Sequence, residues 1–494
     1  MVKLRKILFA FFTVLYLIVC PTLILYSLGI VIKPGKENII KTGVIYISSI
    51  PPGASVSLNG TPLNEETPAL IDNLLPGNYT LTLKAANYQV WTTTASVSSE
   101  KATPLENILL LPDPVKTNEL SEEPVNKLIP VEDNPFLIVT TGPNAKDIFV
   151  HIWDEGITQN ILPERPGKTP RLKPLFPEGT NQYKGRVLRI FSVDGNSHLI
   201  FEIENNGEKK FLWTDPLFGE SKTEDITRLF PVQPDSIEWS KDDPRHLLSF
   251  QNNTINRIDI ATKAVYPRIA EKVTAFTQYE EKLFVLSDVN TLTRANIDNV
   301  RETARPVSSN PLFNELVLRN APFLKMTAVS HNIILLLGKG GQLISNLKPY
   351  LLAEGGIVGF KWNTKPRQIL LWSRDKIGFI DFSKNMLEAN PPSITWVQEK
   401  ARDITNAFWV NEGSHILFTD SDQMFIAAVS CCGMTDIKKL RDIRRQSDIY
   451  YSDRTGKVFF IDKGTARLSS MEIIPQHALL PTVRRDKNIK EERE

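Results

Sequence analysis

Two basic stretches are the parts of the sequence best suited to bind an anionic partner. Residues 163–179, PERPGKTPRLKPLFPEG, form a long Pro-rich insertion, and residues 438–445 read KKLRDIRR. Long loops on a rigid scaffold often carry binding sites, and clustered Lys and Arg attract anionic polymers or lipid headgroups. The alternatives are a surface loop without a partner for the first stretch, and a solvated connector or short helix for the second. The candidate partner-binding residues are Arg165, Lys168, Arg171, Lys173, Lys438, Lys439, Arg441, Arg444 and Arg445.

The residue types that serve catalysis and metal binding are scattered along the chain. The sequence contains no His-Glu-x-x-His, Gly-x-Ser-x-Gly or Cys-x-x-Cys motif. The histidines are interpreted as surface residues or satisfied polar residues, and they include His151, His198, His246, His331 and His415. The sequence therefore predicts no catalytic residue, no metal site and no cofactor.

Two short segments resemble sites but lack essential residues. Residues 166–169, Pro-Gly-Lys-Thr, look like the end of a phosphate loop, but Leu162 stands where that loop requires its first Gly. Cys431 and Cys432 are adjacent, with no second cysteine pair and no nearby His to complete a zinc site. We interpret these cysteines as small buried residues in a strand.

The overall composition is that of a folded, nearly neutral protein. The 58 Lys and Arg against 56 Asp and Glu leave a formal charge of +2, which provides no field to attract nucleic acid. The 33 Pro exceed the 25 Gly, which favours strands and turns over long helices. At 494 residues the chain is expected to form several units unless a large propeller or barrel takes up most of it.

An apolar segment near the N-terminus predicts a membrane anchor. Residues 7–32 carry no charge, and a helix of this length spans roughly 39 Å, which is enough to cross a bilayer. The apolar core of a cleaved signal peptide is shorter, so an uncleaved anchor after a short cytoplasmic tail, residues 1–6, is favoured. The flanking charges are nearly balanced. The short tail and long remainder favour an extracytoplasmic C-terminal bulk, and the alternative is a cytoplasmic sensor in the reverse orientation.

The segment that follows the anchor shows the turn and strand pattern of a small β-sandwich. Pro52-Gly53 suits the central positions of a type II turn, and Asn59-Gly60 is a strong hairpin signal. Between them, Ala54, Val56 and Leu58 alternate with polar residues, as in a half-buried strand. A second turn at residues 75–78 is followed by another alternating run. Short antiparallel strands are therefore expected over residues 43–111.

This region resembles a PEGA domain. The residues that carry the resemblance are Pro51-Pro52-Gly53-Ala54, Asn59-Gly60, Thr67-Pro68, Leu75-Pro76-Gly77 before Tyr79, and the aromatic pair Tyr88 and Trp91. The Glu of the family's Pro-Glu-Gly-Ala turn is replaced here by Pro52, which suits the turn equally well. The resemblance implies a small β-module of bacterial or archaeal surface proteins, often beside a membrane anchor and without catalytic residues.

Beyond an acidic, Pro-rich segment at residues 112–134, which is expected to be an extended linker, β-rich segments recur over residues 135–475. Trp239 and Trp362 are 123 positions apart, or three steps of 41, and Trp409 follows 47 positions later. A period of about 40–50 residues in four-strand units is typical of a β-propeller, here with about seven blades, although six or eight also fit. The alternative is two successive β-sandwiches.

These observations predict a mainly β protein with an N-terminal transmembrane helix, a small β-sandwich, a β-propeller and a charged, disordered tail at residues 476–494. The predicted function is that of a membrane-anchored extracytoplasmic binding or scaffolding protein of the bacterial cell envelope. It is predicted to be non-catalytic and to bind an envelope protein or polysaccharide. The alternative is a propeller enzyme acting on envelope or extracellular glycans at its central channel.

Overall fold

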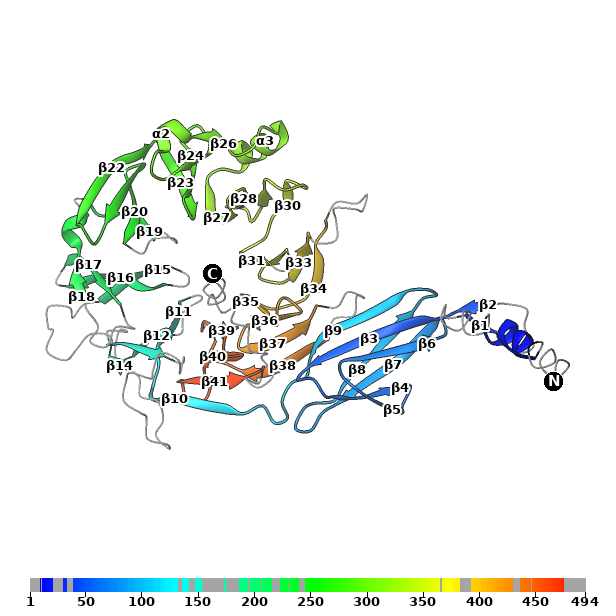
Figure 1. The fold of residues 1–494 in the computed structure, drawn as a ribbon. Coiled ribbons are helices and arrows are strands. Elements are labelled where there is room, and N and C mark those ends of the chain that lie inside the picture. Colours follow the sequence, from blue (N-terminus) through cyan, green and yellow to red (C-terminus); the bar gives the residue numbers. More distant parts are fainter. Residues whose placement is uncertain are drawn as a thin grey trace, which may run out of the picture. The chain divides into compact units, whose positions relative to one another are not determined.

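The computed structural model consists mainly of β-strands (Figure 1). The described residues are 9, 11–20, 30–32, 39–131, 136–141, 147–152, 173–174, 186–193, 196–205, 207–215, 223–230, 232–239, 245–364, 367–382, 392–429, 436–445 and 447–474. The adjacent cysteines and the predicted tail at residues 476–494 lie outside these residues. The chain divides into two compact units, residues 1–116 with 472–494, and residues 117–471.

The N-terminal segment contains a short helix and a small strand pair. Residues 11–20 are helical, and β1 (Ile30–Ile32) pairs antiparallel with β2 (Ile39–Lys41). The end of the expected 7–32 helix is thus a strand, in keeping with the β preference of branched side chains. Within the described part of the chain, no helix combines the length and apolarity that a bilayer crossing requires.

Two sheets form the small β-unit that follows. One has the strand order β6-β3-β9 and the other β5-β4-β7-β8. The expectation of antiparallel strands was wrong for one pair, since β3 and β9 run parallel. The bounds are β3 (Gly43–Ile50), β4 (Ser55–Leu58), β5 (Thr61–Glu66), β6 (Ala69–Leu74), β7 (Gly77–Lys84), β8 (Trp91–Val97) and β9 (Ala102–Leu109). Alternate residues of β3 and β7, among them Ile45, Ile47, Leu81 and Leu83, are fully buried in one apolar core. This is the burial that period-two alternation predicts.

The turns of this unit have the predicted conformations. Gly53 has φ +82°, as the second central position of a type II turn requires. Asn59 and Gly60 have φ +50° and +82° and join β4 to β5, as in a type I′ hairpin. The predicted strand between these turns is also confirmed, since Ala54 and Val56 are fully buried.

Within the described residues of the second unit, the strands form eight four-stranded antiparallel sheets. In Figure 1 these sheets follow one another in chain order around a common centre. The first four are β11 (Lys127–Pro130), β12 (Phe136–Thr141), β13 (Asp147–Ile152) and β14 (Lys173–Pro174); β15 (Arg186–Val193), β16 (Asn196–Asn205), β17 (Glu208–Thr214) and β18 (Thr223–Asp225); β19 (Ser236–Trp239), β20 (His246–Gln251), β21 (Thr254–Asp259) and β22 (Ala264–Glu271); and β23 (Val273–Tyr279), β24 (Lys282–Ser287), β25 (Leu292–Asn296) and β26 (Arg305–Pro306). The other four are β27 (Phe323–Ser330), β28 (Ile333–Gly338), β29 (Leu343–Ser345) and β30 (Leu351–Ala353); β31 (Gly359–Asn363), β32 (Gln368–Trp372), β33 (Ile377–Asp381) and β34 (Thr395–Gln398); β35 (Ile404–Val410), β36 (His415–Asp420), β37 (Gln423–Ala428) and β38 (Ile437–Asp442); and β39 (Tyr450–Ser452), β40 (Lys457–Ile461), β41 (Arg467–Glu472) and β10 (Thr117–Pro124).

The segment expected to be a linker contains two strands of these sheets. β10 pairs with β41 and completes the last sheet, while β11 opens the first. Leu120, Val125 and Leu128 are buried, so the apolar residues between the acidic ones pack against the sheets. The eight sheets are one more than the expected seven and match the alternative of eight, and two of them are completed by strands that lie before residue 135.

Apolar clusters join successive sheets. One cluster contains residues of β16, β17 and β20 and so joins two neighbouring sheets. Comparable clusters join each other pair of neighbouring sheets from the β11–β14 sheet to the β35–β38 sheet. Trp239 and Trp362 lie on the first strands of sheets three positions apart, and Trp409 lies on the first strand of the next sheet. The Trp spacing therefore reports the repeat correctly.

A polar pair recurs where the second strand of a sheet begins and the third ends. His198 faces Asp215 at 3.2 Å, and His246 faces Asp259 at 3.6 Å. Gln368 Nε2 donates to Asp381 at 3.4 Å in a third sheet. The corresponding pair in a fourth sheet is Lys282 and Asn296, with Nζ donating to Oδ1 at 2.6 Å. The shared position indicates a common structural role in the repeat.

Short helices interrupt the strand pattern. They are η4 (Thr227–Leu229), α2 (Val300–Thr303) and α3 (Pro311–Asn320). The side chain of Asn310 caps α3 by accepting from the Leu312 amide at 3.0 Å, and Phe313 and Val317 pack into the core between the β23–β26 and β27–β30 sheets.

Candidate functional site

The first basic stretch lies almost entirely outside the described residues. This is true of Arg165, Lys168 and Arg171. Lys173 belongs to β14, whose backbone pairs with β13. Partner binding by these residues stays a prediction.

The second basic stretch is part of a strand. Lys438, Lys439 and Arg441 lie on β38, the outer strand of its sheet, and Arg444 and Arg445 follow it. The expected connector or short helix was therefore wrong. These residues form a strand because residues 437–442 pair antiparallel with β37 at the edge of the sheet.

Aspartates neutralise much of this basic strand. Lys438 pairs with Asp436 at 3.5 Å, Lys439 with Asp442 at 2.8 Å, and Arg441 with Asp462 at 2.9 Å. The Lys439 ammonium, by donating a hydrogen bond, lowers the pKa of the Asp442 carboxyl. The guanidinium of Arg444 donates to the carbonyl oxygen of Val125 at 2.8 Å. This pairing reduces the positive potential that the strand offers to an anionic partner.

A shallow pocket of about 450 Å³ lies beside this strand. Its lining alternates in charge, with Lys439, Arg441 and Lys463 beside Asp442 and Asp462. Such a lining suits a polar surface contact better than a dedicated anion site.

A buried carboxylate was missed by the sequence analysis. Glu202 is 1% exposed, and its carboxylate accepts from Arg189 Nε and from Gln233 Nε2 at 3.1 Å, while Lys209 Nζ lies 3.4 Å away. These residues line a cavity of about 500 Å³. Because the carboxylate is fully paired, the network holds β15, β16 and the segment before β19 together. A single Glu in an alternating strand gives no sequence signal of such a role.

The most distinctive cluster lies between two hairpin tips of neighbouring sheets. Glu280 and Glu281 form the two-residue turn between β23 and β24, flanked by the Tyr279–Lys282 pair. His331 lies in the equivalent turn between β27 and β28 of the next sheet. Glu280 adopts φ +49°, a conformation that Gly or Asn usually occupies at such a turn. We call Glu280, Glu281 and His331 the cross-sheet cluster.

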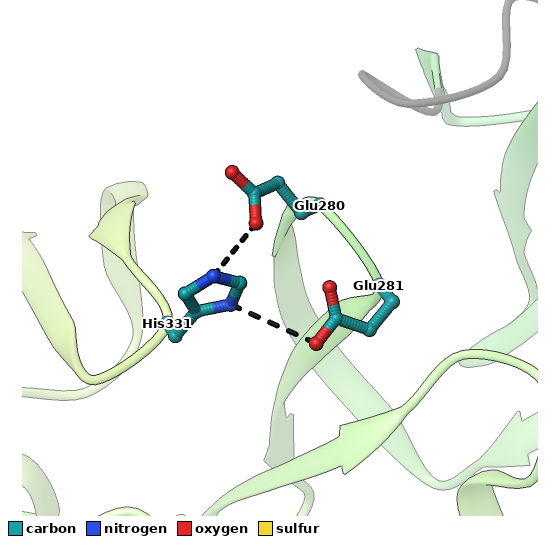
Figure 2. A group of neighbouring side chains, drawn as sticks. All are labelled: Glu280, Glu281 and His331. Atoms are coloured by element: carbon teal, nitrogen blue, oxygen red, sulfur yellow. Dashed lines mark ion pairs between the residues drawn. The ribbon is translucent and has the colours of Figure 1, made fainter. Parts of the chain in front are cut away.

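The imidazole of His331 lies between the two carboxylates (Figure 2). Its Nε2 is 2.7 Å from Glu280 Oε2, and its Nδ1 is 3.8 Å from Glu281 Oε1. The exposed fractions are 45% for His331, 39% for Glu280 and 49% for Glu281. The cluster is thus open to water and to small ions.

Neighbouring residues hold the two tips together without using the ligand atoms of the cluster. Arg294 of β25 donates to the carbonyl oxygen of His331 at 2.9 Å and to Asn332 Oδ1. The Tyr279 ring meets the imidazole edge to face, with centroids 5.3 Å apart. Arg294 thus holds the backbone of His331 and Tyr279 holds its ring, and both contacts cross the interface between the two sheets.

One cation competes for the cluster. Lys282 Nζ is 3.0 Å from Glu281 Oε1. The pKa of Glu281 is held below its usual value, first by a hydrogen bond from its own backbone N–H and then by Lys282. Glu281 is therefore ionised at neutral pH and available as an anionic ligand.

The cluster combines donor types that bind divalent metals. One ligand atom from each residue can be chosen so that all lie within 4.8 Å of one another, and among the described residues no other group of three meets this condition. Imidazole nitrogen with carboxylate oxygen suits borderline ions such as Zn²⁺. From the sequence, His331 was interpreted as a surface or satisfied polar residue because the histidines are scattered along the chain. The sequence feature that could have linked Glu280 to His331 is their shared position, since each lies in the turn between the first and second strands of its repeat.

A buried histidine offers a contrast. His415 opens β36, is 8% exposed, and places Nδ1 2.9 Å from Ser414 Oγ. Burial, and secondarily the charge of Lys438, lowers the pKa of His415 to about 4. It therefore remains neutral at physiological pH and serves packing.

Comparison with known proteins identifies one family within the chain. Residues 42–109 match the PEGA domain. No curated protein matches the chain.

Several solved structures resemble the chain at low identity. A crystal structure described as the eukaryotic initiation factor is 11% identical, with a TM-score of 0.45, covering 75% of this chain and 96% of that one. The computationally designed Ika8 protein is 12% identical, with a TM-score of 0.40, and the match covers 72% of this chain and 99% of that one. PorZ of Porphyromonas gingivalis, a surface component of the type-IX secretion system, is 11% identical, with a TM-score of 0.36. The match covers 70% of this chain and 42% of that one. Scores this low carry no argument about function. Residues 42–109 of this chain are a PEGA domain, and a β-propeller-like region follows it.

Proposed function

We propose that the protein is a membrane-anchored binding or scaffolding protein of the bacterial cell envelope, with its C-terminal bulk outside the cytoplasm and without catalytic activity. The observation that carries the proposal is the PEGA domain directly after an apolar, uncharged N-terminal segment. Modules of this family are expected beside membrane anchors on cell surfaces.

The exposure of the N-terminal helical residues supports the anchor. Phe11 is 62% exposed, Phe12 56%, Tyr16 66% and Leu17 63%. A contiguous set of large apolar side chains is unfavourable in water and becomes favourable in hydrocarbon. A lipid environment accounts for this exposure.

The paired surface charges support a binding role that depends on shape and hydrogen bonding. The basic strand β38 is matched by aspartates, and its pocket is polar and shallow. A neutral polysaccharide or an envelope protein fits such a surface better than a polyanion does. The expected partner is therefore one of these two classes.

Membrane extraction of the full-length chain from bacterial cells tests the anchor. The chain should stay in the membrane fraction through alkaline carbonate and leave it with detergent. The double substitution Phe12→Lys and Leu17→Lys should release it, since a charge costs about 3 kcal/mol at a helix centre and less toward the ends. Lysine at Leu312 and Leu318 of α3, which are similarly exposed at 63% and 58%, is the matched control and should not. Release of the unmodified chain by carbonate would contradict the anchor.

Protease accessibility and binding test the remainder of the proposal. Protease added to intact spheroplasts should degrade the C-terminal bulk while a cytoplasmic marker survives, and protection of that bulk would favour the reverse orientation. The detergent-solubilised chain should retain an envelope protein or polysaccharide from envelope extracts. Release of new reducing ends from envelope glycans would instead support the propeller enzyme.

A further inference from the structure

We propose that the cross-sheet cluster binds one divalent transition-metal ion of the Zn²⁺ class, with Glu280, Glu281 and His331 as ligands. This inference does not rest on the membrane anchor or on the binding role proposed above. It assigns a ligand to the junction of the β23–β26 and β27–β30 sheets.

The distances in the cluster are close to those of a metal site. Ligands about 2.1 Å from a tetrahedral ion lie about 3.4 Å from one another. The His331 Nε2 to Glu280 Oε2 distance of 2.7 Å is that of a hydrogen bond, which the ion replaces after a small outward rotation of the carboxylate. Glu281 Oε1 lies 3.8 Å from the other ring nitrogen, Nδ1, and one ligand atom of each residue can be chosen so that all three lie within 4.8 Å of one another. Both side chains are partly exposed and can make these rotations at little cost.

The two turns are held in place independently of the ion. Arg294 fixes the His331 backbone and Asn332, and Tyr279 packs against the imidazole. A site whose backbone is already positioned loses less conformational entropy when it binds. The ligands come from separate sheets, so the folded chain binds the ion more tightly than the unfolded chain does.

Charge and coordination also favour an ion. Two carboxylates face one imidazole, and the nearest cation, Lys282, is shared with Asn296 at 2.6 Å. Three protein ligands leave a fourth position of a tetrahedral ion to water or to a group on a partner.

Calorimetric titration of the untagged full-length chain in detergent with ZnCl₂ tests the site. We expect one saturable site that raises the thermal midpoint of unfolding. H331Q, and separately the E280Q/E281Q pair, should weaken affinity about tenfold or more. K282Q should tighten it, because that ammonium no longer competes for Glu281.

H246Q is the matched control, since His246 also faces a carboxylate but lies outside the cluster. It should bind Zn²⁺ as the unmodified chain does. Circular dichroism of each variant establishes that it is folded. The proposal is overturned if Zn²⁺ does not saturate one site, if Ca²⁺ binds and Zn²⁺ does not, or if folded H331Q and E280Q/E281Q retain full affinity.

Discussion

The cross-sheet cluster and the interior of the β35–β38 sheet contain the same side chain in opposite settings. His331 lies in water between two carboxylates, whereas His415 is buried beside Ser414 and near the charge of Lys438. At the first position two carboxylates face the two nitrogens of a partly exposed imidazole. At the second, burial and the charge of Lys438 disfavour the charged imidazole. The repeat therefore supplies similar positions, and local burial decides whether a histidine serves chemistry or packing.

The largest expected effect concerns His415 and pH. The folded pKa of about 4 lies below the ordinary value of 6.5, so the neutral form is favoured by folding. As the pH falls from 6.5 toward 4, the unfolded chain binds a proton at this histidine and the folded chain does not. The free energy of unfolding therefore decreases over this range, by about 3 kcal/mol in total. Urea unfolding followed by fluorescence at several pH values should show this loss in the transition of the second unit.

The matched variant for this prediction is His415→Leu. It should remove this part of the pH dependence, while acid loss from paired aspartates such as Asp422, whose pKa Lys463 lowers through a hydrogen bond, remains in both proteins. If the free energy of unfolding of His415→Leu falls with pH as much as that of the unmodified protein, the buried His415 is not the cause of the loss. The contrast between His331 and His415 would then fail.

A smaller effect is expected from the buried carboxylate network. Glu202→Ala should reduce the free energy of unfolding by about 2 kcal/mol, because Arg189 and Gln233 lose a buried acceptor. The loss stays moderate because Arg189 and Lys209 are 37% and 39% exposed and can turn to water. Denaturant unfolding at neutral pH measures it, and a change below about 0.5 kcal/mol would show that the network adds nothing.

His331→Gln should change metal-free stability by only about 0.5 kcal/mol, since exposed ion pairs contribute little. Thermal unfolding in the presence of a chelator measures this change. A cost as large as that at a buried site would mean that the cluster is a structural clamp, and would erase the distinction between the two histidines.

The smallest effect is expected at the recurring polar pair. His246→Gln should alter the free energy of unfolding by less than about 0.5 kcal/mol, because Gln368 already serves the same position by donating to Asp381. Denaturant unfolding checks this. A loss above 1 kcal/mol would show that the imidazole itself is needed, as in the ring contact between His198 and Trp239 of the next sheet.

The parts of the fold predicted correctly are those encoded locally. Asn59-Gly60 specifies its hairpin through backbone geometry, and the spacing of Trp239, Trp362 and Trp409 specifies the repeat. The strands at residues 117–130 were missed because their composition is acidic and Pro-rich while their partners lie far away in sequence. The cross-sheet cluster was missed for the same reason, since no local pattern links Glu280 to His331.

The pairing of β10 with β41 has a consequence for how the chain is made. Ser121 accepts from the Leu468 amide across 347 positions, so a nascent chain carries this strand without a partner until its last segments emerge. An unpaired strand invites aggregation, and charged side chains protect it. Glu119, Glu122 and Glu123 keep this segment soluble during the wait, and Glu119 then meets Arg467 at 2.7 Å. The acidity that made the segment resemble a linker is thus the property that lets it serve as a late-docking strand.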